Sequence, residues 1–213
     1  MTRSPAWSGN WTSDPRAAPT GAPTHFDDGN RMPRSCRCLA LTLLTSCSGL
    51  PPFPPASDPP PRCEDVAVSV PSEGWAHVAD GTMVTYAHNP PASGPHFNRW
   101  LAHRAYDRPA QRQNWVHNLE HGGVVLLFRP DAPQSAIDEL KSAFESAPTD
   151  VVCGHSRTLL TPDPLLVENV AAVAATRMIT GETLDRDRIH TFIRACRGQG
   201  PEDVCSSGDA AAP

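Results

Sequence analysis

Apolar and polar positions alternate along some segments of the chain and recur at helical spacing along others. Residues 65–70 alternate apolar and polar side chains, which predicts a strand, and residues 82–86 predict a second one. Residues 123–128 form an unbroken β-prone run that ends at Arg129-Pro130, the profile of a buried central strand. A further short strand is predicted over residues 149–153.

Helical spacing of apolar side chains marks two other segments. The first predicted helix covers residues 133–147, where Ile137, Leu140 and Phe144 share one face. The second covers residues 184–196, whose apolar face consists of Leu184, Ile189, Phe192 and Ile193.

Two stretches between these elements are less regular. Residues 167–179 are apolar with an ambiguous period, which favours a strand and leaves a helix as the alternative. Residues 87–116 contain Asn-Pro-Pro and Ser-Gly-Pro turns, which predict a long structured loop. The whole pattern predicts an α+β fold, with a small mixed sheet covered on one side, two main helices and long Pro/Gly-rich loops.

The N-terminal part of the chain differs in composition. Residues 1–31 are polar and lack a periodic apolar pattern, so we expect them to be disordered or to precede the true start of the protein. Residues 32–47 resemble a lipoprotein signal peptide, with a short n-region at 33–37 that carries Arg34 and Arg37, an apolar run at 38–44 and a lipobox that ends at Cys47. This interpretation requires Met32 as the initiator; a plain secretory leader is the alternative.

Both interpretations place the mature protein outside the cytoplasm. With Cys47 lipidated, we expect a cell-envelope protein anchored in the membrane on the periplasmic or extracellular face. The proline-dense residues 48–62 favour an extended tether. Residues 63–205 are predicted to form a single folded domain, and residues 206–213 a disordered tail.

The charge balance and the length of the apolar stretches limit which partners the protein can bind. The sequence has 18 basic and 23 acidic residues, a formal net charge of −5, and this balance argues against a nucleic-acid-binding surface. No apolar stretch reaches the roughly 18 residues of a membrane-spanning helix. We therefore expect two kinds of partner: the membrane, through the lipid anchor, and proteins of the envelope.

Cysteine usage agrees with export. Apart from Cys36, Cys38 and Cys47 in the leader, four cysteines remain, and an even number in an exported chain predicts disulfides: Cys63, Cys153, Cys196 and Cys205. Four cysteines allow three connectivities, and pairing each terminal cysteine with an internal one would fasten both ends of the domain. No C-x-x-C spacing supports a cysteine metal site.

Histidines carry the candidate chemistry. His117 and His121 lie four residues apart, so they share one face if the segment is helical, and imidazole is the commonest protein ligand for transition metals. His96 ends a proline-stiffened loop that holds its side chain at low entropic cost. Together with His77 these residues are the predicted metal ligands, and Glu120 could orient a ligand histidine or act as a base. His88, His103, His155 and His190 are more simply explained as solvated or hydrogen-bonded, although His88 or His103 could complete a site.

Two motifs resemble a bacterial family catalogued as domain of unknown function 3105. They are Pro90-Pro91-Ala92-Ser93-Gly94-Pro95-His96 and His117-Asn118-Leu119-Glu120-His121-Gly122-Gly123, and the similarity extends over residues 75–205. The resemblance implies that the motif histidines fall on His77, His96, His117 and His121, the motif glutamate on Glu120, and that the protein is exported or membrane-attached. Ala92 stands in place of a usual threonine, and Thr176 in place of an expected tryptophan. The resemblance supplies no reaction.

Three hypotheses of function follow. The first is an exported lipoprotein that binds copper or zinc, with copper favoured by the Irving–Williams order. The second is a metal-dependent oxygenase or hydrolase that uses the same histidines. His117-x-x-Glu120-His121 also matches the H-x-x-E-H string of inverted zincin peptidases, but the following Gly122-Gly123 and β-prone run disfavour the long helix that those enzymes need. The third is a metal-free envelope module, whose histidines would point apart or bury against one another.

Overall fold

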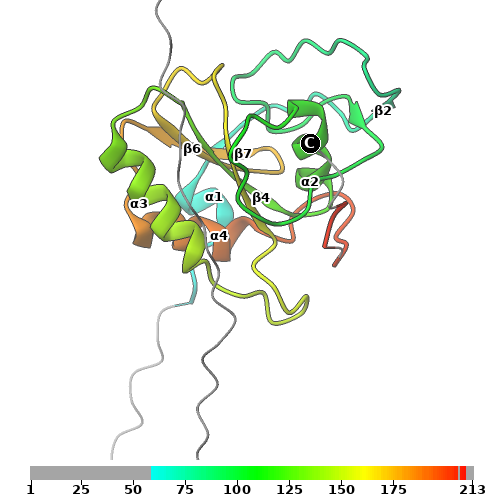
Figure 1. The fold of residues 1–213 in the computed structure, drawn as a ribbon. Coiled ribbons are helices and arrows are strands. Elements are labelled where there is room, and N and C mark those ends of the chain that lie inside the picture. Colours follow the sequence, from blue (N-terminus) through cyan, green and yellow to red (C-terminus); the bar gives the residue numbers. More distant parts are fainter. Residues whose placement is uncertain (1–58, 206, 210–213) are drawn as a thin grey trace, which may run out of the picture. The chain divides into compact units, whose positions relative to one another are not determined.

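The computed structural model describes residues 59–205 and 207–209, so the proposed signal peptide and Cys47 lie outside the described residues. It has four helices, a five-stranded mixed sheet and a small two-stranded sheet, which confirms the predicted α+β class (Figure 1). The elements are α1 (Cys63–Val66), β1 (Val68–Ser69), β2 (His77–Val78), β3 (His96–Phe97), α2 (Arg112–Glu120), β4 (Val124–Phe128), α3 (Gln134–Glu145), β5 (Thr158–Pro162), β6 (Val170–Ala174), β7 (Arg177–Gly181) and α4 (Arg186–Cys196). Within these residues, no helix has the length and hydrophobicity needed to cross a bilayer.

Strand β4 lies inside the main sheet, whose order is β1-β7-β6-β4-β5. It pairs in parallel with β5 and antiparallel with β6. Val124 and Leu126 of β4 belong to one apolar cluster, whereas Val125 and Leu127 belong to a second cluster. Successive side chains of a strand point to opposite faces, so the two clusters lie on the two faces of the sheet and both faces are buried. This burial on both faces explains why β4 is apolar at every position.

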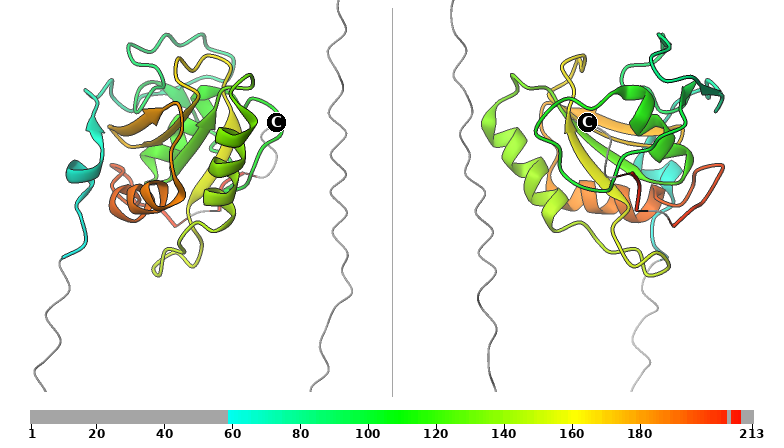
Figure 2. Two further views of the ribbon diagram at one scale, coloured as in Figure 1. Left: turned by 90° about the vertical axis from the view of Figure 1, so that its left-hand side faces the viewer. Right: turned by 45° about the vertical axis from the view of Figure 1, so that its right-hand side comes forward.

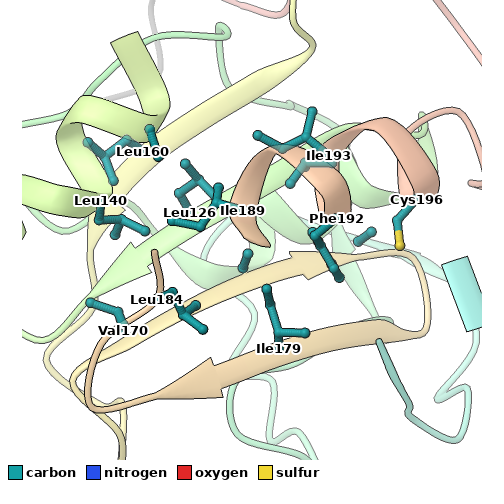
Figure 3. Close-up of a cluster of buried hydrophobic side chains, with 14 of the residues drawn as sticks. Leu126, Leu140, Leu160, Val170, Ile179, Leu184, Ile189, Phe192, Ile193 and Cys196 are labelled. Carbon is teal, nitrogen blue, oxygen red and sulfur yellow. The ribbon is translucent and has the colours of Figure 1, made fainter. Parts of the chain in front are cut away.

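The first cluster lies between the sheet and the helices α3 and α4 (Figure 3). Leu140 of α3 and Phe192 of α4 pack there against Leu126 and Ile179 of the sheet. The predicted helices over 133–147 and 184–196 are therefore confirmed, with bounds trimmed by one to two residues at most ends. Asp185 caps α4 by accepting a hydrogen bond from the Arg188 backbone N–H at 2.8 Å.

The second cluster covers the opposite face of the sheet. Trp115, Val116 and Leu119 of α2 pack there with Val125 and Leu127 of β4. Figures 1 and 2 show α2 and the long loops on this side of the sheet, with α3 and α4 on the other. The expectation of a sheet covered on one side was wrong, because α2 begins within the segment 87–116 that was predicted to be a loop and covers the second face.

Three predicted strands need correction. Residues 82–86 form no strand, and Tyr86 instead packs beside the loop that leads to His96. Residues 149–153 form a turn, because the Asp150 carboxylate accepts hydrogen bonds from the backbone of Val152 and Cys153. The predicted strand over 65–70 is reduced to the two residues of β1, which follow the short helix α1.

The apolar stretch 167–179 contains the whole of β6 and the start of β7, so the favoured strand interpretation is correct and the helix alternative is not. β6 and β7 form an antiparallel hairpin that turns at Thr176, whose φ is 55°. The turn is tied to two distant segments, because Thr176 donates its N–H to the Ala92 carbonyl at 2.8 Å and accepts from Val70 at 2.9 Å. Ala92 and Thr176, the two departures from the family pattern, are therefore in direct backbone contact.

Two disulfides close the domain, as the cysteine count predicts. Cys63 pairs with Cys196 and Cys153 with Cys205, at sequence separations of 133 and 52 residues. Each terminal cysteine is thus paired with an internal one. The first bridge fastens α1 to the end of α4 within the buried cluster.

Candidate metal centre

The two-stranded sheet brings the first two histidines together. β2 and β3 pair in parallel with His77 opposite His96. Side chains at paired positions lie on the same face of a sheet, and the two imidazole rings are 4.7 Å apart between centroids. Residues 19 positions apart thus become neighbours through a ladder of two residue pairs.

The loop before His96 is fixed by close contacts. Gly94 has a φ of 127°, and a Cβ at this position would lie 2.7 Å from Cε1 of Tyr86. Tyr86 donates its hydroxyl proton to the Pro95 carbonyl at 2.8 Å, and Ser93 accepts a hydrogen bond from the Glu73 backbone at 2.7 Å. The Ser-Gly-Pro-His motif therefore holds His96 in one place, as its stiffness predicts.

Helix α2 supplies the remaining side chains of the centre. His117 and Glu120 lie three residues apart and face the same side, and His121 follows at the C-cap. The helix ends because Gly122 adopts a φ of 73°, and the Gly123 N–H donates to the Asn118 carbonyl at 2.7 Å. The motif's two glycines thus serve the sharp exit from helix to strand.

Asn118 connects α2 to the loop beside the centre. Its side-chain amide accepts a hydrogen bond from the Leu101 N–H at 2.8 Å and donates to the Leu101 carbonyl at 2.7 Å. The neighbouring Trp100 ring lies 5.0 Å from His117 and 4.8 Å from His121 between centroids. On the other side, Trp75 meets His96 edge-on at 6.2 Å. Two tryptophans therefore flank the histidines.

Three imidazole nitrogens converge on a single carboxylate oxygen, Oε2 of Glu120. The distances from this oxygen to Nε2 are 3.0 Å for His96, 3.3 Å for His77 and 3.6 Å for His117. The ligand atoms of these four residues all lie within 4.8 Å of one another. The Glu120 side chain is 5% exposed and that of His77 is 45% exposed, so the group is buried on one side and open to solvent on the other.

Hydrogen bonds at the far side of the rings determine which nitrogen is available. Nδ1 of His96 lies 2.8 Å from the Gly94 carbonyl, and Nδ1 of His117 lies 2.6 Å from the Phe97 carbonyl. A carbonyl only accepts, so each Nδ1 carries the proton, and in the neutral ring Nε2 holds a lone pair. Burial, with further contributions from the neighbouring histidines, lowers the pKa of His117 to about 4, although the bond to Phe97 opposes this shift.

The contact of neutral His96 with Glu120 depends on a cation. A neutral Nε2 and a carboxylate oxygen are both hydrogen-bond acceptors, and at 3.0 Å their contact is favourable only with a proton or a metal ion between them. Histidine ligands of metals characteristically donate their other ring N–H to a carbonyl or carboxylate, which fixes the tautomer. The group of His77, His96, His117 and Glu120 could therefore hold a metal ion.

The structure brings most of the predicted site residues into one group and places His121 beside it. His77, His96 and His117 come together as a group, and Glu120, predicted to orient a ligand or act as a base, contributes its own ligand atom to that group. His121 lies beside the group, with its Nε2 2.8 Å from Nε2 of His117. It joins a second group with Glu120 and Glu202. Glu202 was not identified as a site residue from the sequence, because it lies 81 positions from His121 along the chain.

His103 lies outside both groups and packs against His155, with ring centroids 5.0 Å apart. Burial, reinforced by His155 and by the charge of Arg157, lowers the pKa of His103 to about 4. The unfolded state binds this proton near the ordinary pKa of about 6.5, so stability is lost as the pH falls from about 6.5 towards 4. His155, by contrast, accepts a hydrogen bond from the Arg157 N–H through Nδ1.

Replacing His103 with glutamine should therefore flatten the acid limb of the stability profile. We expect the loss of unfolding free energy between pH 7 and pH 5 to be smaller in His103→Gln than in the wild type, by on the order of 1 kcal/mol. Urea denaturation of chelator-treated protein at the two pH values measures this difference. His190→Gln, on α4, serves as the control, and parallel profiles for His103→Gln and wild type would contradict the prediction.

Comparison with known protein families covers the residues of the candidate centre. Residues 77–208 match the family model described as protein of unknown function (DUF3105). No curated protein and no solved structure matches the chain. The matched region covers more than half of the sequence and includes His77, His96, α2 and Glu202, so the chain belongs to the DUF3105 family.

Proposed function

We propose that the protein is an exported lipoprotein that binds a transition-metal ion through His77, His96, His117 and Glu120. The observation that carries the proposal is the convergence of three Nε2 atoms on Oε2 of Glu120, at 3.0–3.6 Å, with Nδ1 of His96 and His117 held by carbonyls. In this arrangement the lone pairs and the negative charge point to one small volume.

Copper or zinc suits this set of donors best. Imidazole nitrogens bind both ions, and zinc also accepts a carboxylate oxygen in place of a histidine. The domain's cysteines are paired in disulfides, which removes the thiolates that a softer site would use. Where both ions are available, the Irving–Williams order favours Cu(II), and we therefore propose copper ahead of zinc.

The proposed location is the cell envelope. Disulfides form and persist in oxidising compartments, so the two bridges support export. Cys47 would hold the protein to the membrane by its lipid, and the proline-rich segment 48–62 would give the domain distance from the bilayer. The partners in this proposal are the membrane and proteins of the envelope, with no nucleic acid.

A metal-dependent enzyme is the second candidate, and the exposure of His77 favours it. Catalytic metal sites keep a coordination position open to substrate, and 45% of the His77 side chain is exposed beside the buried carboxylate. An oxygenase or a hydrolase is compatible with these ligands. The inverted zincin hypothesis gains no support, because α2 has nine residues and ends at Glu120.

Metal content tests the proposal directly. The purified chain, without a polyhistidine tag, is offered copper and zinc in equal amounts, and bound metal is counted by mass spectrometry. We expect at least one metal ion per chain, with copper ahead of zinc, and its loss in His96→Ala and His117→Ala. His190→Ala is the matched control, because His190 lies on α4 and its ring bonds the Ala143 carbonyl.

The same experiment identifies the metal-free alternative. If the wild type takes up neither ion and the histidine variants are merely less stable, the motif histidines are structural. The third hypothesis, an envelope interaction module, would then replace the metal proposal, and cross-linking in the envelope would be the next measurement.

A further inference from the structure

We propose that the centre holds a second cation, bound by Glu120, His121 and Glu202, so that Glu120 bridges two metal ions. This inference rests on the proposed function, because Glu120 and the neighbouring His117 belong to the first site. It assigns a ligand role to Glu202, which follows the glycine-rich turn after α4.

The ligand atoms of the three residues are already grouped. Glu120, His121 and Glu202 each offer one atom, and these atoms all lie within 4.8 Å of one another. Nδ1 of His121 lies 3.8 Å from Oε2 of Glu202. All three histidine contacts of Glu120 are made by Oε2, so its other carboxylate oxygen takes no part in them. A carboxylate with two oxygens can bind one ion through each of them, and paired metal sites place their ions about 3.5–4 Å apart.

His121 provides an independent indication of a cation. Its Nε2 lies 2.8 Å from Nε2 of His117, and its Nδ1 lies 3.3 Å from the Glu202 carbonyl oxygen. His117 uses its own proton on the Phe97 carbonyl, so its Nε2 is an acceptor. Both nitrogens of His121 therefore face acceptors, whereas a neutral imidazole has one N–H. In the neutral ring one lone pair therefore meets another acceptor, and a metal ion removes this conflict.

Glu202 is held in position by its backbone. Its N–H donates to the Glu120 carbonyl at 3.0 Å, and the Gly198 N–H donates to the Gly122 carbonyl at 2.8 Å. The turn passes so close to α2 that a Cβ on Gly200 would lie 2.6 Å from the Leu119 carbonyl oxygen. Figure 1 shows this C-terminal segment, in red, alongside α2. The glycine is thus required for Glu202 to reach the end of the helix.

Neighbouring contacts on both sides fasten the same segment. Asp203 pairs with the buried Arg157 at 2.6 Å, and Arg157 also donates to the His121 carbonyl. Two residues further on, Cys205 forms the disulfide with Cys153. The Glu202 side chain itself is 58% exposed, so it can adjust to an ion while its backbone stays in place.

Metal stoichiometry of the full chain tests the inference. Copper(II) is titrated into tag-free wild type and Glu202→Gln, and bound copper is counted after removal of excess metal. We expect two ions per chain in the wild type and one in Glu202→Gln, with Glu145→Gln on α3 as the carboxylate control. Electron paramagnetic resonance gives a second readout: two neighbouring Cu(II) ions couple and lose signal, whereas the single ion of Glu202→Gln shows the full uncoupled spectrum.

The outcomes separate this inference from the proposed function. One ion in both proteins would overturn the second site and leave the first intact. Two ions in both would place the second ion away from Glu202, which also overturns the inference. One ion in the wild type that is lost in Glu202→Gln would make Glu202 a ligand of a single centre. No ion in the wild type would overturn the proposed function together with the inference.

Discussion

Replacing both Cys63 and Cys196 with alanine should lower the free energy of unfolding by about 2–5 kcal/mol, the usual cost of losing a native disulfide. This bridge links residues 133 positions apart, so its loss frees almost the whole domain in the unfolded state. Both cysteines are buried, at 1% exposure, in the cluster under α3 and α4. Alanine avoids placing a hydroxyl there. Chemical denaturation of oxidised protein, compared with the double variant, measures the loss.

The second bridge provides the matched control. Cys153 and Cys205 lie 52 positions apart and do not belong to either buried cluster. The longer loop loses more entropy when it is closed, so Cys153→Ala/Cys205→Ala should be destabilised less than Cys63→Ala/Cys196→Ala. Equal losses would contradict the ranking by loop length, and an unchanged midpoint on removal of the longer bridge would show that fastening α1 to α4 contributes little to the stability of the domain.

The parts of the fold that the sequence predicted well are those in which one local pattern decides the structure. The apolar run of β4 is buried on both faces, and α3 and α4 each place one apolar stripe on the sheet. The α2 segment lacks such a stripe. Its buried residues include Asn114, His117, Asn118 and Glu120, which face the centre or hold loops, so the helix carries no amphipathic signal. Because these buried positions are polar, no hydrophobic pattern in the sequence predicts the helix.

The candidate site was predictable in its residues more than in its geometry. The short spacing of His117 and His121 and the stiff loop before His96 indicated residues that the structure does bring close together. The pairing of His77 with His96 depends on two short strands that no hydrophobic pattern announces. The approach of Glu202 depends on a glycine turn that packs on α2 far along the chain. Long-range backbone contacts of this kind leave no local signature in a single sequence.

Glu120→Gln should weaken metal binding at least about a hundredfold, the upper end of what loss of an outer-sphere partner causes, because a ligand and its negative charge are removed together. The change keeps the size and shape of the side chain, so packing is preserved in its buried position. Competition titration against a chelator of known affinity, on tag-free protein, measures the loss. Glu145→Gln, on α3, is the control for removal of a carboxylate far from the histidines.

The same variant should behave in the opposite way once the metal is removed. Without a cation, the Glu120 carboxylate faces Nε2 of His96 and of His117 at 3.0 and 3.6 Å, and in the neutral rings these two atoms are acceptors because Nδ1 carries the proton. A glutamine amide can donate a proton to the His96 Nε2 and no longer buries a charge, so chelator-treated Glu120→Gln should melt at a higher temperature than chelator-treated wild type. Thermal denaturation with and without metal checks both signs. If Glu120 only oriented a histidine through hydrogen bonds, Glu120→Gln would melt at a lower temperature than wild type both with and without metal. That result would show that Glu120 is not a metal ligand.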